Sequence, residues 1–304
     1  MIVIARKTGR LGNRLKLFSH FIAFSVEHQI PIANPSFYKY AHLFRGTQHS
    51  DLWCRYLPGI TDKPDATHQN AHSIAIPQWG RGVLYQSLHA LLETSTAVGL
   101  TRWPMAIHSI ELGQSCSINK DPFLSLAKQK NIWVRGYRYR CSDLVVKHVE
   151  KVRDFFQPTL LDQQRVDSVL DSARSQASMV VGVHIRHGDY KTYLDGKYYY
   201  PVSAYLAIMR QVTKLYPDQT IEFVVCSDAK FSTDDFSGVK VRISQESPQV
   251  DMYTLAGCDC LIGPPSSFTE WAAFYGGKPL YKIVDIEREV QTSDFEFRIK
   301  SMIA

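Results

Sequence analysis

An arginine, two histidines and an aspartate stand close together in the segment VVGVHIRHGDY, residues 180–190. The guanidinium group of Arg186 is planar and can make paired hydrogen bonds to a phosphate. His184 and His187 flank it, and Asp189 follows. We therefore predict that this segment binds a phosphate group.

Two further polar segments follow apolar runs. Asp228 follows the run 221–226 after one serine, Ser227, and its carboxylate can accept two hydrogen bonds from one edge of a guanine base. Ser266 and Ser267 open a predicted helix, where free N–H groups and the helix dipole favour an anion. A nucleoside diphosphate would satisfy all three segments.

The elements that position these side chains form an alternating pattern. Strands that alternate with helices imply right-handed crossovers and a parallel sheet, whose ligands lie at the carboxyl ends of the strands. No G-x-G-x-x-G follows any strand, which argues against a dinucleotide oxidoreductase. The predicted strands are 179–185, 221–226, 239–243, 258–262 and 280–283, and the predicted helices are 202–215, 250–256 and 268–275.

The amino-terminal part begins with a predicted strand at residues 2–5, a loop and a long apolar helix. Gly9 and Gly12 permit a tight turn between this strand and the helix. Asn13 could cap the helix or face a ligand, because this loop also follows a strand. The pattern over 35–125 is weaker and broken by prolines, which predicts irregular loops between short elements.

The length of 304 residues predicts two domains, because one core seldom spans so long a chain. We assign residues 1–150 to the first domain and 179–304 to the second. Helical spacing runs through 142–177, and Pro158 should split it into two helices. We assign 151–178 to the connection between the domains.

Charge and cysteine content limit the class of protein. The net charge is +6, without basic tracts, which suits an acidic ligand such as a nucleotide or a weak peripheral contact with an anionic membrane. We expect no nucleic acid partner. Six cysteines without framework spacing favour free thiols in a reducing compartment. We find no signal peptide and no apolar run of roughly 18 residues, so we expect no transmembrane segment and a cytoplasmic protein.

Each polar residue also has a structural interpretation. Arg186 could form an ion pair with Asp189 or Glu270. His184 could be a hydrogen-bonded core histidine, because strand alternation places it opposite its apolar neighbours. Asp228 and the serine pair could cap helices. Three independent caps need not share one sheet edge, so we favour a common ligand.

Four segments resemble the motifs of bacterial α-1,2-fucosyltransferases, which are related to α-1,6- and protein O-fucosyltransferases. HIRHGDY is similar to their H-x-R-R-x-D-Y motif, and GRLGNR resembles their amino-terminal G-x-G-N segment. CSDA is similar to their Ser/Thr-Asp motif, and IGPPSSFTEWAAFYGGKP resembles their last motif. The four keep their order over residues 9–279. One position departs from the pattern, because His187 stands where the family has a second arginine.

The resemblance implies an α/β fold of two Rossmann-like domains facing each other across a cleft, the arrangement called GT-B. Residues 1–150 would form the acceptor side, and residues 179–304 would hold the donor. GDP-fucose would be the donor and a glycan the acceptor, with no required metal or other cofactor. The reaction would be inverting, and the linkage would be α-1,2.

The resemblance also implies roles for single residues. Arg186 would contact the diphosphate, His184 would lie beside it, and Asn13 would face the transferred sugar, which makes these three the expected catalytic residues. Asp228 would read guanine. The remaining residues expected to bind the GDP-sugar are Gly12, Ser266, Ser267 and Phe268.

No motif identifies the base that would deprotonate the acceptor hydroxyl. An inverting reaction places this base opposite the diphosphate, on the side of the amino-terminal domain. His20, His42 and Asp51 are candidates of a suitable chemical type.

Three other functions remain open from the sequence. One is a GT-B transferase that uses another nucleotide sugar. A second is a metal-dependent hydrolase with His184, His187 and Asp189 as ligands, although their spacing does not easily aim all three at one point. The third is a non-catalytic protein that binds a nucleotide or a glycan.

Overall fold

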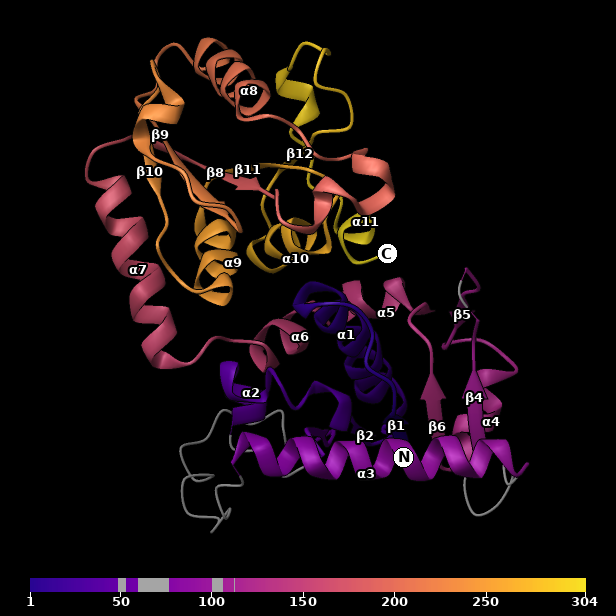
Figure 1. Ribbon diagram of the computed structural model, residues 1–304. Coiled ribbons are helices and arrows are strands. Elements are labelled where there is room, and N and C mark those ends of the chain that lie inside the picture. The colour runs from indigo at the N-terminus through magenta and orange to yellow at the C-terminus, as the bar shows by residue number, and fades with distance from the viewer. Residues whose placement is uncertain (49–52, 60–76, 100–105, 112) are drawn as a thin grey trace. The chain divides into compact units, whose positions relative to one another are not determined.

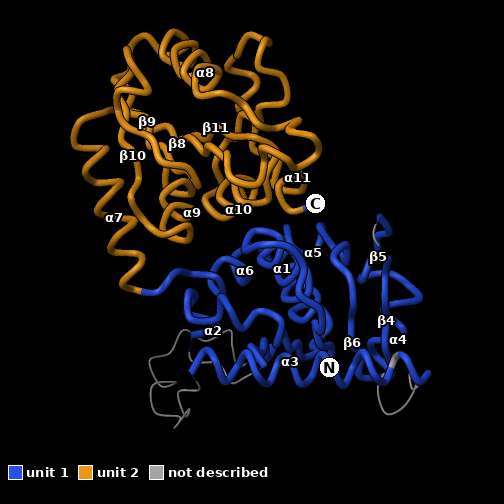
Figure 2. Tube along the Cα trace, in the orientation of Figure 1, with its two compact units in different colours: residues 1–159, 304 blue, residues 160–303 orange. Residues whose placement is uncertain are grey.

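The computed structural model describes residues 1–48, 53–59, 77–99, 106–111 and 113–304. The chain divides into two compact units, residues 1–159 with Ala304 and residues 160–303 (Figure 2). Each unit has its own five-stranded sheet with helices against it, so each is an α/β structure. Within the described ranges, no helix is both long enough and apolar enough to cross a lipid bilayer.

The sheet of the first unit has the strand order β3-β2-β1-β6-β4. All neighbouring pairs are parallel except β2 with β3. The chain runs outward from β1 to β2 and later returns on the other side of β1, so the order reverses between β1 and β6. The strands are β1 (Ile2–Ile4), β2 (Ile32–Ala33), β3 (Arg55–Tyr56), β4 (Ala106–Ser109) and β6 (Ile132–Arg135), and a small separate sheet pairs β5 (Cys116–Ser117) with β7 (Tyr139–Arg140).

Helix α1 (Leu11–His28) is the centre of the first unit's core. Its wide apolar face is buried, as the sequence predicts. The ring of Phe18 lies 5.4 to 5.6 Å from the rings of Phe37, Phe155 and Phe156. The other helices of this unit are α2 (Arg45–Gln48), α3 (Gln78–Ala97), α4 (Phe123–Gln129), α5 (Ser142–Lys147) and α6 (Val149–Phe155).

The prediction of irregular structure over 35–125 is wrong where α3 lies, because this helix has 20 residues. Two glycines, Gly80 and Gly82, lower the helix propensity of its first turn. Its apolar residues do not form one clean stripe, since Trp79 is exposed. Both features hide the helical period in the sequence.

The sheet of the second unit has the order β10-β9-β8-β11-β12 and is parallel throughout. The chain runs from β8 to β9 and β10, then crosses to β11 and β12, so the order reverses between β8 and β11. Helix α8 covers one face, and α9 and α10 cover the other (Figure 1). The elements are α7 (Leu160–Arg174), β8 (Met179–Ile185), α8 (Val202–Leu215), β9 (Ile221–Ser227), β10 (Val241–Ile243), α9 (Pro248–Gly257), β11 (Cys260–Gly263), α10 (Ser267–Gly276), β12 (Leu280–Lys282) and α11 (Ile299–Ile303).

The predicted pattern of the second unit is confirmed to within a few residues at each boundary. Pro158 separates α6, which ends at Phe155, from α7, which begins at Leu160, as predicted. The prediction of two helices over 142–177 is wrong in number, because α5 ends at Lys147 and α6 begins at Val149. The helices of the segment 142–177 divide between the units, with α5 and α6 in the first and α7 in the second.

Candidate active site

The carboxyl ends of β8, β9 and β11 lie side by side at one edge of the second sheet (Figure 1). The register pairs Ile185 of β8 with Ser227 of β9 and Val183 of β8 with Ile262 of β11. The three polar segments therefore leave the sheet from neighbouring strands. They surround the point where the strand order reverses, which is where open α/β sheets bind ligands.

Arg186 forms an ion pair with Asp189, one of the two partners that the sequence left open. Its Nε lies 2.9 Å from Oδ1 of Asp189, and its Nη2 lies 3.0 Å from Oδ2. The guanidinium carbon also lies 4.7 Å from the ring centroid of Tyr190. Glu270, the other possible partner, pairs with Lys282 at 2.6 Å. Arg186 is thus held in one orientation.

The ion pair leaves part of the Arg186 guanidinium available. A guanidinium group has five N–H donors, and Asp189 occupies only the edge formed by Nε and Nη2. Within the described residues, Nη1 donates to no other group. Burial acts to lower the pKa of Arg186, but Asp189, Tyr190 and Asp228 raise it above its usual value, so the group stays charged. The free edge can still bind a phosphate in a paired manner.

His184 is a buried, hydrogen-bonded core histidine, the structural interpretation that the sequence left open. It is 5% exposed, and its Nδ1 lies 2.6 Å from Oγ1 of Thr269 on α10. Its ring stacks on Phe268, with 4.7 Å between centroids. Burial first, and then Arg186, lowers the pKa of His184 to about 3, so the imidazole is neutral near pH 7. It positions Phe268, and any further catalytic role stays a prediction.

Asp228 holds the loop that follows β8. Its Oδ1 accepts hydrogen bonds from the backbone N–H groups of His187 at 2.8 Å and Gly188 at 3.0 Å. A Cβ added at Gly188 would lie 2.7 Å from Oδ2 of Asp228, so the loop approaches this carboxylate closely. The sequence did not foresee this contact. Guanine recognition by Asp228 stays a prediction, and it would have to use mainly Oδ2.

The two serines at the start of α10 have different positions and roles. Ser266 is the N-cap, and its Oγ accepts from the backbone N–H of Phe268 at 3.3 Å. Ser267 is the first residue of the helix and is partly exposed. The hydroxyl of Tyr190 donates to the carbonyl of Pro265 at 2.6 Å, which ties the loop after β8 to the loop after β11. The capping interpretation thus holds for Ser266, and the first-turn N–H groups of α10 sit at the same sheet edge.

His187, the position that departs from the family motif, makes structural contacts. Its Nε2 lies 2.7 Å from the carbonyl oxygen of Tyr200 and therefore carries the proton of that hydrogen bond. Its ring lies 4.5 Å from the ring of Tyr199 and 5.4 Å from that of Phe231. His187 thereby fastens the segment that leads to α8, which the sequence did not predict.

The three ligands of the hydrolase alternative do not converge. His184 contacts Thr269, His187 contacts the carbonyl of Tyr200, and Asp189 pairs with Arg186. In the part of the chain that the structure describes, no group of three or more His, Cys, Asp or Glu side chains is placed to hold a metal ion. The geometry therefore gives the hydrolase no support.

Asn13 belongs to the first unit and does not cap α1, because the helix already begins at Leu11. Its Oδ1 accepts from the hydroxyl of Tyr137 at 3.0 Å, and in the described parts of the chain its amide nitrogen donates to no other group. The role of Asn13 in facing the sugar stays a prediction. Gly9 makes the predicted tight turn with φ of 57°, and a Cβ there would lie 2.2 Å from Nδ2 of Asn13. Gly12 lies inside the helix, so the prediction that it belongs to the turn is wrong.

None of the candidate bases gains support. His20 is fully buried in the first unit, and its Nδ1 accepts from the backbone N–H of Cys141 at 3.0 Å, so it is a core residue. His42 is exposed in the middle of a short 3-10 helix, Ala41–Leu43. Asp51 lies outside the described residues.

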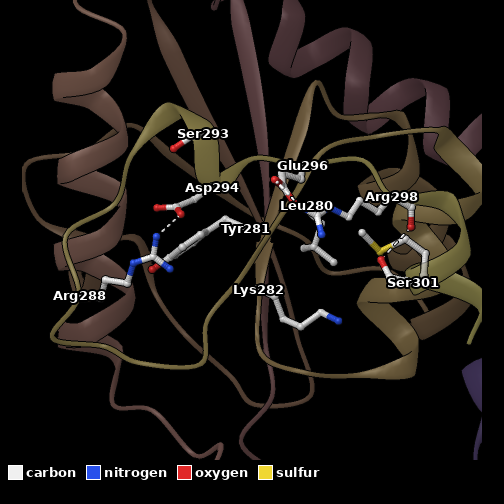
Figure 3. Close-up of a pocket in the computed structure, with 10 residues that line it drawn as sticks. Leu280, Tyr281, Lys282, Arg288, Ser293, Asp294, Glu296, Arg298 and Ser301 are labelled. Atoms are coloured by element: carbon white, nitrogen blue, oxygen red, sulfur yellow. Dashed lines mark hydrogen bonds and ion pairs between the residues drawn. The ribbon is translucent and has the colours of Figure 1, made fainter.

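A cavity of about 370 Å³ lies against β12, and it contains none of the predicted site residues (Figure 3). Three of its cations are paired, Arg288 with Asp294, Arg298 with Glu296, and Lys282 with Glu270 of α10. The residues that line it come from β12 and the chain that follows it, and not from the segments that carry Arg186, Asp228 and the serine pair.

The sequence of this chain matches a family model. Residues 114–301 match the model described as Glycosyl transferase family 11, and this span includes Arg186, Asp228 and the serine pair. Among curated protein sequences, none gives a significant match.

The fold is similar to those of two fucosyltransferases. A mutant of Arabidopsis thaliana FUT1 in complex with GDP is 13% identical, with a TM-score of 0.55, covering 93% of this chain and 70% of that chain. NodZ from Bradyrhizobium is 18% identical, with a TM-score of 0.53, covering 93% and 95%. A structure of NodZ α-1,6-fucosyltransferase co-crystallised with GDP is 18% identical, with a TM-score of 0.53, and the match covers 92% of this chain and 94% of that chain. These similarities show a fold of the GT-B type, as the sequence predicted.

Proposed function

This chain belongs to glycosyl transferase family 11 and is a fucosyltransferase, so we propose that it transfers fucose from GDP-fucose to a hydroxyl group of a glycan. The structures of Arabidopsis thaliana FUT1 and NodZ with GDP support a GDP-sugar as the donor. The resemblance of HIRHGDY to the family motif supports an α-1,2 linkage formed with inversion.

One observation carries the proposal, namely the free edge of the Arg186 guanidinium at the point where the strand order reverses. Asp189 holds the other edge with two hydrogen bonds, so the cation needs no reorganisation when a diphosphate binds. The side chain of Arg186 is only 13% exposed, and water therefore screens its charge less than it would screen a surface arginine.

The proposed reaction is a single displacement at the anomeric carbon of fucose. The acceptor oxygen forms a bond to this carbon while the bond to the β-phosphate oxygen breaks. The electron pair of the broken bond stays on GDP, where Arg186 stabilises it more strongly in the transition state than in bound GDP-fucose. The acceptor proton leaves to a base that the described contacts do not identify. Asn13 would orient the sugar through its amide donors.

The nucleotide would occupy the neighbouring strand ends. The first turn of α10 offers backbone N–H groups to a phosphate, with Ser266 and Ser267 at its start. Phe268, which is stacked on the neutral His184, offers a ring for the base. Asp228 would accept from the guanine edge through Oδ2.

We further propose that no metal ion or cofactor takes part. Arg186 and the dipole of α10 supply the positive charge that a metal would otherwise provide at the diphosphate. This cationic role is consistent with the raised pKa of Arg186, which keeps the group charged throughout the ordinary pH range.

A donor panel tests the proposal. The purified chain is incubated with GDP-fucose, GDP-mannose, UDP-galactose and a mixture of glycan acceptors, and released nucleotide and labelled product are both measured. We expect fucosylated product from GDP-fucose alone. Transfer from a uridine diphosphate sugar, with no transfer from GDP-fucose, would contradict the donor assignment and favour the other nucleotide-sugar transferase.

A further inference from the structure

Two cations lie among tyrosine rings in the first unit. Lys7, in the loop after β1, donates from Nζ to the hydroxyl of Tyr38 at 3.1 Å. The same Nζ lies 5.0 Å from the ring centroid of Tyr38 and 4.6 Å from that of Tyr85. The guanidinium carbon of Arg14 lies 5.1 Å from the ring centroid of Tyr40. We call these five residues the Lys7 cluster.

The charges of the Lys7 cluster are not neutralised by carboxylates. Over the described parts of the chain, neither Lys7 nor Arg14 lies within ion-pair distance of an acidic side chain. Arg14 is 9% exposed and donates to the backbone carbonyls of Gly9 at 3.2 Å and Ser36 at 3.0 Å. Burial lowers the pKa of Arg14, and the charges that act to raise it come from tyrosine hydroxyls alone. The cluster therefore has a net positive charge.

The position of the Lys7 cluster is that of a ligand site. Lys7 follows β1, next to the point where the strand order of the first sheet reverses, and ligands of open α/β sheets bind there. The same loop continues through Gly9 to Asn13. Tyr38 and Tyr85 stack on each other with 5.4 Å between centroids, which makes a rigid wall. The Lys7 ammonium has three donors, and one of them binds the hydroxyl of Tyr38, its only hydrogen-bond partner among the residues that the structure describes.

We propose that the Lys7 cluster binds an anionic group, a sugar carboxylate or a sugar phosphate, on the glycan acceptor. This inference rests on the proposed function and names the class of its acceptor. The two remaining donors of Lys7 would bind the anion, and Arg14 would add to its stabilisation from below the surface. The aromatic wall would contact the apolar face of the same sugar.

A role for the Lys7 cluster in binding the donor is less well supported by the residues. The proposed diphosphate site in the second unit already combines Arg186 with the start of α10. The Lys7 cluster is a second, independent set of positive charges in the other unit. An acidic acceptor gives this second set a ligand of its own.

The test measures binding without the donor, by isothermal titration. The probes are an oligosaccharide with hexuronate residues and its carboxyl-reduced form, and an oligosaccharide with phosphate groups and its dephosphorylated form. The proteins are wild type, Lys7→Met, Lys7→Arg and Lys128→Met. Methionine keeps the apolar stem over the rings and removes the charge. Lys128 is an exposed lysine on α4 of the same unit, so its variant controls for total charge.

We expect wild type and Lys128→Met to bind one charged probe about tenfold more tightly than its uncharged form, because a hydrogen bond to a charged group contributes at least this much. Lys7→Met should lose this difference, Lys7→Arg should keep most of it, and the affinity of Lys7→Met for GDP should not change. The charged probe that binds identifies the anion as a carboxylate or a phosphate.

Three outcomes would overturn the inference. They are a wild type that shows no preference for either charged probe, a preference that survives in Lys7→Met, and a loss of GDP affinity in Lys7→Met. Because the donor is absent from the binding experiment, a failure of GDP-fucose as donor would overturn the proposed function and leave this result intact.

Discussion

The two sheet edges of this protein hold their cations in different ways. At the edge of the second unit, Arg186 is paired with Asp189. At the edge of the first unit, Lys7 and Arg14 contact tyrosine rings and backbone oxygens. A carboxylate partner fixes the direction of a cation but offsets part of its charge. An aromatic partner fixes a cation less strictly and leaves its full charge for a ligand.

This difference fits two different tasks. A leaving diphosphate develops charge at one place, so a rigidly oriented donor is most effective there. A group that is bound but does not react requires only an opposite charge and a contact surface on the protein. We therefore interpret the edge with the Arg186–Asp189 ion pair, the paired edge, as the reaction site. The edge with Lys7 and Arg14, the unpaired edge, we interpret as a recognition site.

The largest expected effect comes from removing the paired cation. Arg186→Ala should lower turnover by about 100- to 1000-fold, which corresponds to roughly 2.7 to 4 kcal/mol, as for the loss of one transition-state donor. Arg186→Lys should recover little, because an ammonium group cannot make the paired contact. Turnover and the melting temperature are measured together. A variant that melts much earlier but keeps wild-type turnover per folded molecule would show that Arg186 is structural.

The second prediction separates the two roles of Asp228. GDP at about 100 times its dissociation constant should stabilise the wild type by roughly 2.7 kcal/mol, and UDP and ADP should do so much less. Asp228→Asn keeps Oδ1 as the acceptor for the loop but replaces the second oxygen with a donor. We expect it to fold normally and to lose the preference for GDP in thermal shift assays. Retention of that preference would limit Asp228 to holding the loop.

The third prediction concerns pH at the paired edge. The pKa of His184 is lowered to about 3 in the folded protein by burial, whereas an unfolded histidine has a pKa of about 6.5. The unfolded state therefore binds the proton first as pH falls. Stability that is complete above about pH 6.5 should decline below it, by up to about 1.4 kcal/mol per pH unit.

A matched variant isolates this contribution. In His184→Gln the amide can still bond Thr269 but cannot take up a proton in this range. Urea unfolding at pH 7.5 and 5.5 should show a smaller loss of stability for the variant than for wild type. Equal losses would mean that His184 is not the group responsible.

The fourth prediction tests the unpaired edge. Gly9→Ala should destabilise the protein by about 1 to 2 kcal/mol, because φ of 57° disfavours alanine and its Cβ would collide with Asn13. Gly238→Ala is the control, since Gly238 has φ of 82° and the nearest atom to its added Cβ among the described residues, Nη2 of Arg210, lies at an ordinary contact distance of 3.5 Å. Denaturant midpoints of the two variants compare strain with and without the collision. A similar cost at both positions would show that contact with Asn13 contributes nothing.

The smallest expected effect is that of chelation. If the paired cation replaces a metal at the diphosphate, EDTA should leave turnover almost unchanged. An initial-rate assay with and without the chelator measures this directly. Complete loss, restored by manganese or magnesium, would show that Arg186 does not suffice and that the paired edge needs a further cation.

Much of the second unit could be predicted from its sequence. Strands β8, β9 and β11 are short apolar runs bounded by turn residues, and the helices between them are strongly periodic, so local pattern and global fold agree. Three of the four motifs also identified the sheet edge that carries Arg186 and Ser266. In the first unit, by contrast, glycines and exposed apolar residues obscured α3.

The partners of the site residues were decided only by the tertiary structure. Local sequence could not choose between Asp189 and Glu270 for Arg186, nor show that Asp228 accepts from the loop after β8. Nor could it reveal the Lys7 cluster, whose members Lys7, Tyr38 and Tyr85 are far apart in the chain.

The physical reason is that elements and contacts depend on interactions over different distances along the chain. Strand and helix periods, turns and motif spacing depend on neighbours within a few residues. The sequence of this chain therefore determined most of its α/β elements, their order and the sheet edges at which we expect ligands. Ion pairs, ring stacking and the pKa of a buried histidine depend on atoms that approach only when distant segments pack together. The ion pair of Arg186 with Asp189 and the packing of Lys7 against Tyr38 and Tyr85 belong to this second class, and they distinguish the two sheet edges.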